Sequence, residues 1–177
     1  MPRLPKRLER PPLMEAVVEL RFSPSQESVG DILPGLLYGK LKHLFEKVEP
    51  LPINALPREM RLATPDLAYR PRIRLAGEPR ALLIGDQVVT ISRTPPYSGW
   101  AAFKTLCEEV LRAIHETDLV RALQRFSLKC VNILDLVDRH PFALLNAELR
   151  LADHDIGARR PGAIGREMAG DERGGGA

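Results

Sequence analysis

Residues 94–134 read TPPYSGWAAFKTLCEEVLRAIHETDLVRALQRFSLKCVNIL and contain a turn, a long helix pattern and a long strand pattern. Pro95 and Pro96 lack backbone N–H groups, so they are expected to end the strand before them. Ser98 is expected to cap the helix that follows, because its hydroxyl can accept a free N–H of the first turn. Apolar residues then recur at gaps of three and four, which places them on one helical face: Trp100, Phe103, Leu106, Cys107, Val110, Leu111 and Ile114.

After Glu116 the apolar period changes from about 3.6 to 2, which predicts a strand. One face of this strand holds an apolar set, and we expect it to be buried: Phe126, Leu128 and Cys130. The other face is polar and cationic: Arg125, Ser127 and Lys129. We expect Trp100, Phe103 and Leu128 to belong to the core, although Trp100 would also suit a stacking platform for a ligand.

Upstream of this segment the same periodicities predict a strand, a helix and a meander. Residues 13–22 alternate as a strand does, and a helix is expected from about Ile32 to Val48 with Pro34 in its first turn. A long proline-rich connection follows at 49–71, with a short strand at 58–63. Glycine-containing turns separate the three strands expected next: 72–75, 81–84 and 87–92.

These elements predict an α+β fold, with a mainly antiparallel sheet and two amphipathic helices on one face. A single domain is expected over residues 13–156, ending in a strand at 147–152 and a turn at Asp153-His154-Asp155. Residues 1–12 are expected to form an exposed lead-in, and the glycine- and arginine-rich residues 157–177 a disordered tail. Because the strand pattern stops abruptly there, we expect a chain truncated relative to a longer parent.

The composition describes a mildly basic chain that can bury a core. The 177 residues are 44% hydrophobic, with a net charge of +3 and a pI of about 9.1. No apolar run approaches the roughly 20 residues that span a bilayer, and the N-terminus lacks a signal-peptide pattern. We therefore expect a cytoplasmic protein with no membrane contact. Cys107 and Cys130 both fall on apolar faces and are expected to be structural free thiols.

The sequence contains no recognisable catalytic or cofactor motif. It has no phosphate-binding glycine loop, no HExxH, no CxxC pair and no GxSxG elbow. The four histidines have no spacing suited to a shared metal, so no metal and no cofactor are predicted. Tyr97, in the turn, and Asn132, on the side of the strand expected to be buried, are the most suggestive polar residues. Both are expected to have structural roles, with a ligand site as the alternative.

Four basic residues are candidates for binding nucleic acid or a partner: Arg72, Arg74, Arg125 and Lys129. Arg72 and Arg74 are two residues apart, so they should share a strand face. Arg125 and Lys129 fall on one face of the later strand. An ordinary solvated sheet face is the alternative interpretation for this set.

Three segments together resemble one family. They are PPLMEAVVELRF at 11–22, PGLLYGKLKHLFEKVEPLP at 34–52, and ALLIGDQVVTISRTPPYSGWAAFKTLCEEVLRAI followed by QRFSLKCVNIL. The chain is similar to a sporadically distributed, functionally uncharacterised prokaryotic family with a PPL-E-x-x-x-ELRF start and a PY-x-GW-x-x-F turn. The family's next strand usually reads like RIGLRYINR, so this chain has lost one aromatic there. The resemblance implies a longer parent with a second half rich in strands, and it implies no catalytic residue. Its scattered occurrence is typical of mobile defence or toxin–antitoxin genes.

The leading hypothesis is a bacterial, non-enzymatic binding or interaction protein whose partner is another protein. The setting proposed for it is that of an accessory in a defence or toxin–antitoxin system. The alternative is a nucleic-acid-binding protein that uses a basic sheet face. A metal-independent hydrolase or nuclease using Tyr97 and scattered carboxylates ranks third.

Overall fold

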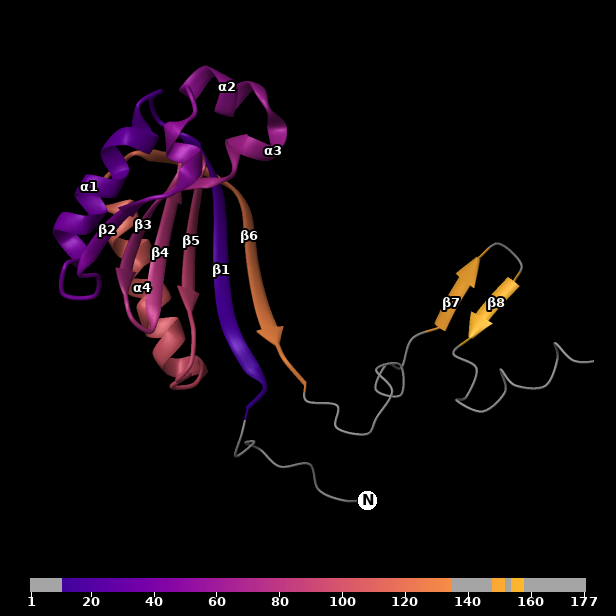
Figure 1. Cartoon of the computed structure of the whole chain (residues 1–177). Helices are drawn as coiled ribbons and strands as arrows, with labels where there is room; N and C mark the ends of the chain where they lie inside the picture. The colour runs from indigo at the N-terminus through magenta and orange to yellow at the C-terminus, as the bar shows by residue number, and fades with distance from the viewer. Residues whose placement is uncertain (1–10, 135–147, 152–153, 158–177) are drawn as a thin grey trace, which may run out of the picture. The chain divides into compact units, whose positions relative to one another are not determined.

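The computed structural model describes residues 11–134, 148–151 and 154–157. The chain divides into two compact units, one ending at Ile133 and one beginning at Leu134. The first holds one sheet and all the described helices (Figure 1). Within the second, β7 (Glu148–Leu151) pairs antiparallel with β8 (His154–Gly157), so the strand expected near 147–152 is present as half of a hairpin. The tail is expected to begin at residue 157, but Gly157 ends β8, and residues 158–177 lie outside the described residues.

The first unit is built on a six-stranded sheet in the order β2-β3-β4-β5-β1-β6. Every neighbouring pair is antiparallel. The bounds are β1 Leu13–Pro24, β2 Lys47–Pro50, β3 Pro71–Gly77, β4 Arg80–Gly85, β5 Val88–Arg93 and β6 Val120–Asn132. The first strand therefore lies inside the sheet, between β5 and the edge strand β6. The three meander strands are sequential neighbours, as their short turns predict.

Two long helices, α1 (Val29–Leu41) and α4 (Trp100–His115), cover one face of this sheet. Four buried aliphatic residues of α1 recur every four positions: Val29, Leu33, Leu37 and Leu41. Together with the apolar stripe of α4 and the inward side chains of β1, β3, β4 and β5 they form one core. The structure thus confirms the α+β class and the two helices on one sheet face.

The 49–71 connection contains short helical turns at one end of the sheet (Figure 1). A 3-10 helix spans Pro52–Ala55, α2 spans Arg58–Ala63 and α3 spans Pro65–Ala68. The strand expected at 58–63 is therefore wrong. Pro57 and Pro65 immediately precede or open these turns, and proline's fixed φ suits a helix start as readily as a strand end.

The first helix also differs from expectation at both ends. It begins at Val29, so Pro34 lies inside it, and it ends at Leu41. Val48, expected on its apolar stripe, pairs instead with Leu75 in the sheet. Local periodicity cannot foresee this, because the stability of an edge strand comes from its partner strand. At α4 the N-cap is Gly99, and the Ser98 hydroxyl accepts a hydrogen bond from Arg93 in place of the expected cap.

A single row of register partners shows how far the helices cover the sheet. The row runs Leu128, Val18, Ile91, Leu82, Leu75, Val48 across all six strands. The four middle side chains are buried, whereas Leu128 is 48% exposed and Val48 is 47% exposed. The helices therefore cover the four central strands and leave both edge strands bare.

Burial separates two aromatic residues that the sequence treats alike. Phe103 is fully buried, but Trp100 is 54% exposed and lies outside the core, which corrects the expectation for it.

We predict that Phe103→Ala lowers the free energy of unfolding by about 3–5 kcal/mol, because it leaves a cavity under α4. Trp100→Ala should cost about 1 kcal/mol or less. Urea unfolding followed by circular dichroism measures both, and equal losses would contradict the structure.

Candidate functional site

The edge strand β6 is unusual among the described elements because it is long, lies at the edge of the sheet and exposes apolar side chains. Its only neighbour is β1, so the backbone groups on its outer side have no strand partner in the described part of the chain. It spans 13 residues, and its ladder is regular from Arg125 to Val131. The other edge strand, β2, has only 4 residues and ends in Pro50. Short strands and proline are common ways to protect a sheet edge, and β6 has neither.

An apolar row lies bare on the helix-covered side of β6. Phe126, Leu128 and Cys130 are opposite Leu20, Val18 and Ala16 of β1, which are core residues. Yet Phe126 is 57% exposed, and Leu128 and Cys130 are also exposed. The expectation that this face is buried is therefore wrong, and Leu128 is not a core residue. The reason is coverage: α1 packs on β3, β4 and α4, while α4 packs on β5.

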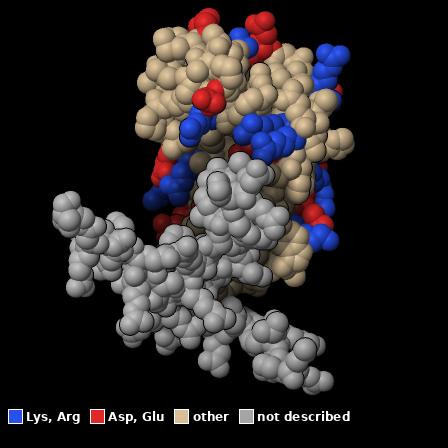
Figure 2. All heavy atoms as spheres, turned by 90° about the vertical axis from the view of Figure 1, so that its right-hand side faces the viewer, with Lys and Arg blue, Asp and Glu red and all other residues tan. Residues whose placement is uncertain are grey.

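The other side of the same strand carries positive charge. Arg125 is opposite Arg21, and Lys129 is opposite Val17. Neither cation has a carboxylate within ion-pair distance among the described residues, and the nearby Glu19 is paired with Arg21 at 2.8 Å. Figure 2 shows the molecule from the right-hand side of Figure 1, with side chains of both signs on this face and Lys and Arg side chains near its centre. The strand from Val120 to Asn132 contains no acidic residue.

The other two predicted basic residues do not join this row. Arg74 is half-exposed and pairs with Glu49 of β2 at 2.8 Å. Arg72 is buried and contacts Asp31 at the start of α1, whereas Arg74 lines the opposite sheet face. A register shift between Pro71 and Ile73 separates the two side chains, so they do not share a face as expected. The four candidates are thus divided among an internal contact, a surface ion pair and the β6 edge.

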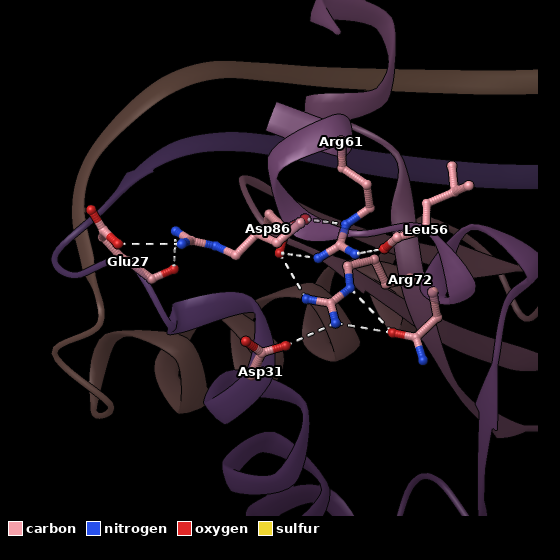
Figure 3. A network of polar contacts seen from close by, with 8 residues as sticks. Glu27, Asp31, Leu56, Arg61, Arg72 and Asp86 are labelled. Carbon is pink, nitrogen blue, oxygen red and sulfur yellow. Dashed lines mark hydrogen bonds and ion pairs between the residues drawn. The ribbon is translucent and has the colours of Figure 1, made fainter. Parts of the chain in front are cut away.

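A buried cluster of charges surrounds Asp86, in the turn between β4 and β5 (Figure 3). Arg61 of α2 donates from Nε to Oδ2 at 2.8 Å, and Arg72 of β3 donates from Nη1 to Oδ1 at 2.7 Å. All three residues are buried. One carboxylate therefore joins α2, β3 and the β4–β5 turn. The sequence offered no signal for this cluster, because a glycine–aspartate turn is ordinary on its own.

The cluster extends to the first turn of α1. Arg72 donates to Asp31 Oδ1 at 2.8 Å and to Asn54 Oδ1 at 3.0 Å. Gly30 packs against the cluster so closely that an added Cβ would lie 2.3 Å from Asp86 Oδ1. Only glycine permits this approach of the helix. The cluster therefore fixes where α1 begins relative to the sheet.

The ionisation of Asp86 follows from two opposing effects. Burial alone would raise its pKa, but hydrogen bonds and positive charge from Arg61 and Arg72 outweigh burial, and the pKa is lowered. For Arg72, burial alone would lower the pKa, but its bonds and charge interactions with Asp31 and Asp86 raise it. The cluster is thus fully charged and internally satisfied, which marks it as structural rather than as a free binding site.

The remaining candidate residues occupy ordinary positions. Tyr97 packs its ring against Phe103 with centroids 6.3 Å apart, and burial raises the pKa of its hydroxyl. Asn132 is exposed at the end of β6 and not buried as expected. Cys107 and Cys130 are both free, one buried and one exposed, and burial raises the pKa of Cys107 to about 11.

Metal ligands and surface hollows are the next features of the described residues. No group of three or more His, Cys, Asp or Glu residues that could hold a metal occurs among them. A hollow of about 440 Å³ on the open sheet face is lined by charges of both signs: Glu15, Arg74, Glu78 and Arg80. Its lining contains neither a histidine nor a cysteine. None of the described helices is long and apolar enough to span a membrane.

Comparison with known proteins adds no family: no protein-family model, curated protein or solved structure matches this chain. Function is therefore argued from geometry. The two distinctive features are the Asp86 cluster and the β6 edge, and only the second is accessible to a partner.

We predict that Asp86→Asn lowers the free energy of unfolding at pH 7 by about 3 kcal/mol, because it leaves two buried guanidinium groups without their shared carboxylate. Glu49→Gln, which breaks the half-exposed pair with Arg74, should cost about 1 kcal/mol or less. Urea unfolding of the two variants beside the wild type makes the comparison. A loss for Glu49→Gln as large as that for Asp86→Asn would contradict the structural role of the cluster.

The Asp86 contribution should also depend on pH. Because its pKa is lower in the folded protein than in the unfolded chain, its stabilisation is present above the unfolded value of about 4 and is lost as pH falls through the folded pKa. The difference between wild type and Asp86→Asn should therefore shrink as the pH falls below about 4. A difference that stays constant over this range would show that the charge of Asp86 is not the source of its effect.

Thiol labelling tests the bare face of β6 directly. We predict that one thiol of the native protein reacts rapidly with Ellman's reagent at pH 8 and that Cys130→Ser removes this fast phase, because only Cys130 is exposed among the two. Cys107→Ser should leave the fast phase intact. Slow labelling of both thiols in the folded wild-type protein would mean that the β6 face is covered.

Proposed function

We propose that this protein is a non-enzymatic interaction module that binds an extended segment of a partner protein along the β6 edge. The observation that supports this is one long, regular edge strand with a bare apolar row, in a sheet whose other edge is short and ends in proline.

Strand addition suits this edge for two physical reasons. An added strand pairs with the outward backbone groups of β6, and these hydrogen bonds supply affinity for any extended peptide. Its side chains on the helix side would cover Phe126 and Leu128, each of which is about half exposed. Completing the burial of each would contribute roughly 1 kcal/mol. Backbone pairing and side-chain burial thus act together.

Binding of nucleic acid is the alternative, and the positions of the cations favour it less. Arg72 is internal and Arg74 is paired, which leaves Arg125 and Lys129 as the members of the predicted set that have no ion-pair partner among the described residues. Glu15 and Glu19 lie on the neighbouring strand, on the same sheet face. A backbone-tracking groove needs a denser field of positive charge.

The wider setting of this module is inferred from the family resemblance. A scattered prokaryotic distribution is typical of mobile defence and toxin–antitoxin genes, so we propose a bacterial accessory protein whose partner is encoded nearby.

A matched pair of variants tests the edge. Leu128 on β6 and Val48 on β2 lie at opposite ends of the same row and are 48% and 47% exposed. We predict that Leu128→Lys removes a stoichiometric protein from an affinity pull-down out of the native host and that Val48→Lys retains it. The measurement is quantitative mass spectrometry of nuclease-treated eluates, with a thermal melt to confirm that both variants fold.

Two results would contradict the proposal. Retention of every bound protein by Leu128→Lys would show that β6 is not the binding edge. Nucleic acid that co-purifies with the chain, if nuclease treatment removes both it and every bound protein, would favour the nucleic-acid-binding alternative.

A further inference from the structure

We infer that the segment bound by β6 is a strand in which acidic and apolar residues alternate, with the acidic side chains beside Arg125 and Lys129 and the apolar ones beside Phe126 and Leu128. This inference rests on the proposed function and adds the chemistry of the partner. It follows from how the two faces of one strand differ.

On the face of the sheet that the helices do not cover, the regular part of β6 favours acidic residues in a partner strand. Arg125 and Lys129 are four residues apart, project on the same side, and form no ion pair among the described residues. In an added strand, the residues opposite and diagonal to them lie within reach of both cations. Glutamate or aspartate there gains attraction, and lysine or arginine there is repelled. Charge therefore selects among strands that backbone pairing alone would accept.

On the helix side, β6 favours apolar residues at the positions of the partner strand that lie between the acidic ones. Phe126, Leu128 and Cys130 continue the apolar rows of β1 outward, past the edge of the helix layer. The side chains of a strand alternate between its two faces. If every second residue of the partner strand is apolar and lies on the helix side, the residues between them lie on the other face, beside Arg125 and Lys129. The two requirements together define a partner strand in which acidic and apolar residues alternate, with the apolar residues on the helix side.

The same charges disfavour a second copy of this chain as the occupant. Pairing β6 with β6 of another copy in an antiparallel way, with matching faces, places each cation either directly opposite or diagonal to another cation. No acidic residue between Val120 and Asn132 is available to compensate. Like charges at these cross-strand positions destabilise a pair. Lysine and arginine on an edge strand thus keep copies apart while admitting an acidic partner.

The experiment uses synthetic seven-residue peptides, the length of the regular ladder from Arg125 to Val131. The probe is acetyl-EVEIEVE-amide, and the controls are acetyl-KVKIKVK-amide and the reordered acetyl-EEVIVEE-amide. Binding to the full chain is measured by isothermal titration calorimetry at low salt. We expect the acidic alternating peptide to bind at least about tenfold more tightly than either control, and more weakly as salt rises.

A charge-reversed protein makes the test specific. Arg125→Glu/Lys129→Glu should weaken the acidic peptide about tenfold or more and bind the lysine peptide better than the wild type does. The matched control is Lys42→Glu/Lys47→Glu, which changes the net charge equally at exposed positions away from β6 and should leave the preference unchanged. Hydrogen exchange with the acidic peptide bound should slow at residues 125–131.

The outcomes separate this inference from the proposed function. Equal binding of all three peptides, or no binding of any, overturns the alternating acidic partner, while the Leu128→Lys pull-down still decides whether β6 binds a protein. A dimer in analytical ultracentrifugation that Leu128→Lys dissolves would identify a second copy as the occupant and overturn it. Tight binding of a single-stranded 20-nucleotide DNA, lost in Arg125→Glu/Lys129→Glu, would also overturn it.

Discussion

The arrangement of the first unit depends on one buried carboxylate. Asp86 receives hydrogen bonds from Arg61 and Arg72, and through Arg72 it is connected to Asp31. These residues come from α2, β3, the β4–β5 turn and the start of α1, so a single charge holds together segments far apart in the sequence. A buried charge is stable only when its partners are in place. The geometry of the whole end of the sheet is therefore tied to this cluster.

Fixing α1 in this way determines which strands are covered. The helix lies over β3 and β4, and α4 lies beside it over β5. Two helices about 10 Å wide cannot cover six strands spaced about 4.8 Å apart, so two edges remain. One edge is the short β2 with Pro50, and the other is the long β6 with Phe126 and Leu128 exposed. The exposed apolar row of β6 is thus a consequence of the width of the helix layer.

The basic residues illustrate how one residue type serves different purposes in this fold. Arg72 is internal and stabilises the framework, Arg74 belongs to a surface ion pair, and Arg125 is accessible at the edge. Of these three residues, only Arg125 is exposed and has no ion-pair partner among the described residues. The described residues contain no group of three or more His, Cys, Asp or Glu that could hold a metal, and the long edge strand β6 with its exposed apolar row is the feature from which function is inferred.

The order of amino acids was sufficient for the fold class, for α4, and for the strands β1, β3, β4, β5 and β6, because periods of 3.6 and 2 are local properties of the chain. It failed at 58–63 and at Val48, where neighbouring segments override local preference. It also placed Leu128 inside, since alternation shows which side chains share a face and not whether another layer covers that face. The Asp86 cluster and the bare β6 edge both depend on contacts between residues distant in sequence, so they became visible only once the elements were packed together.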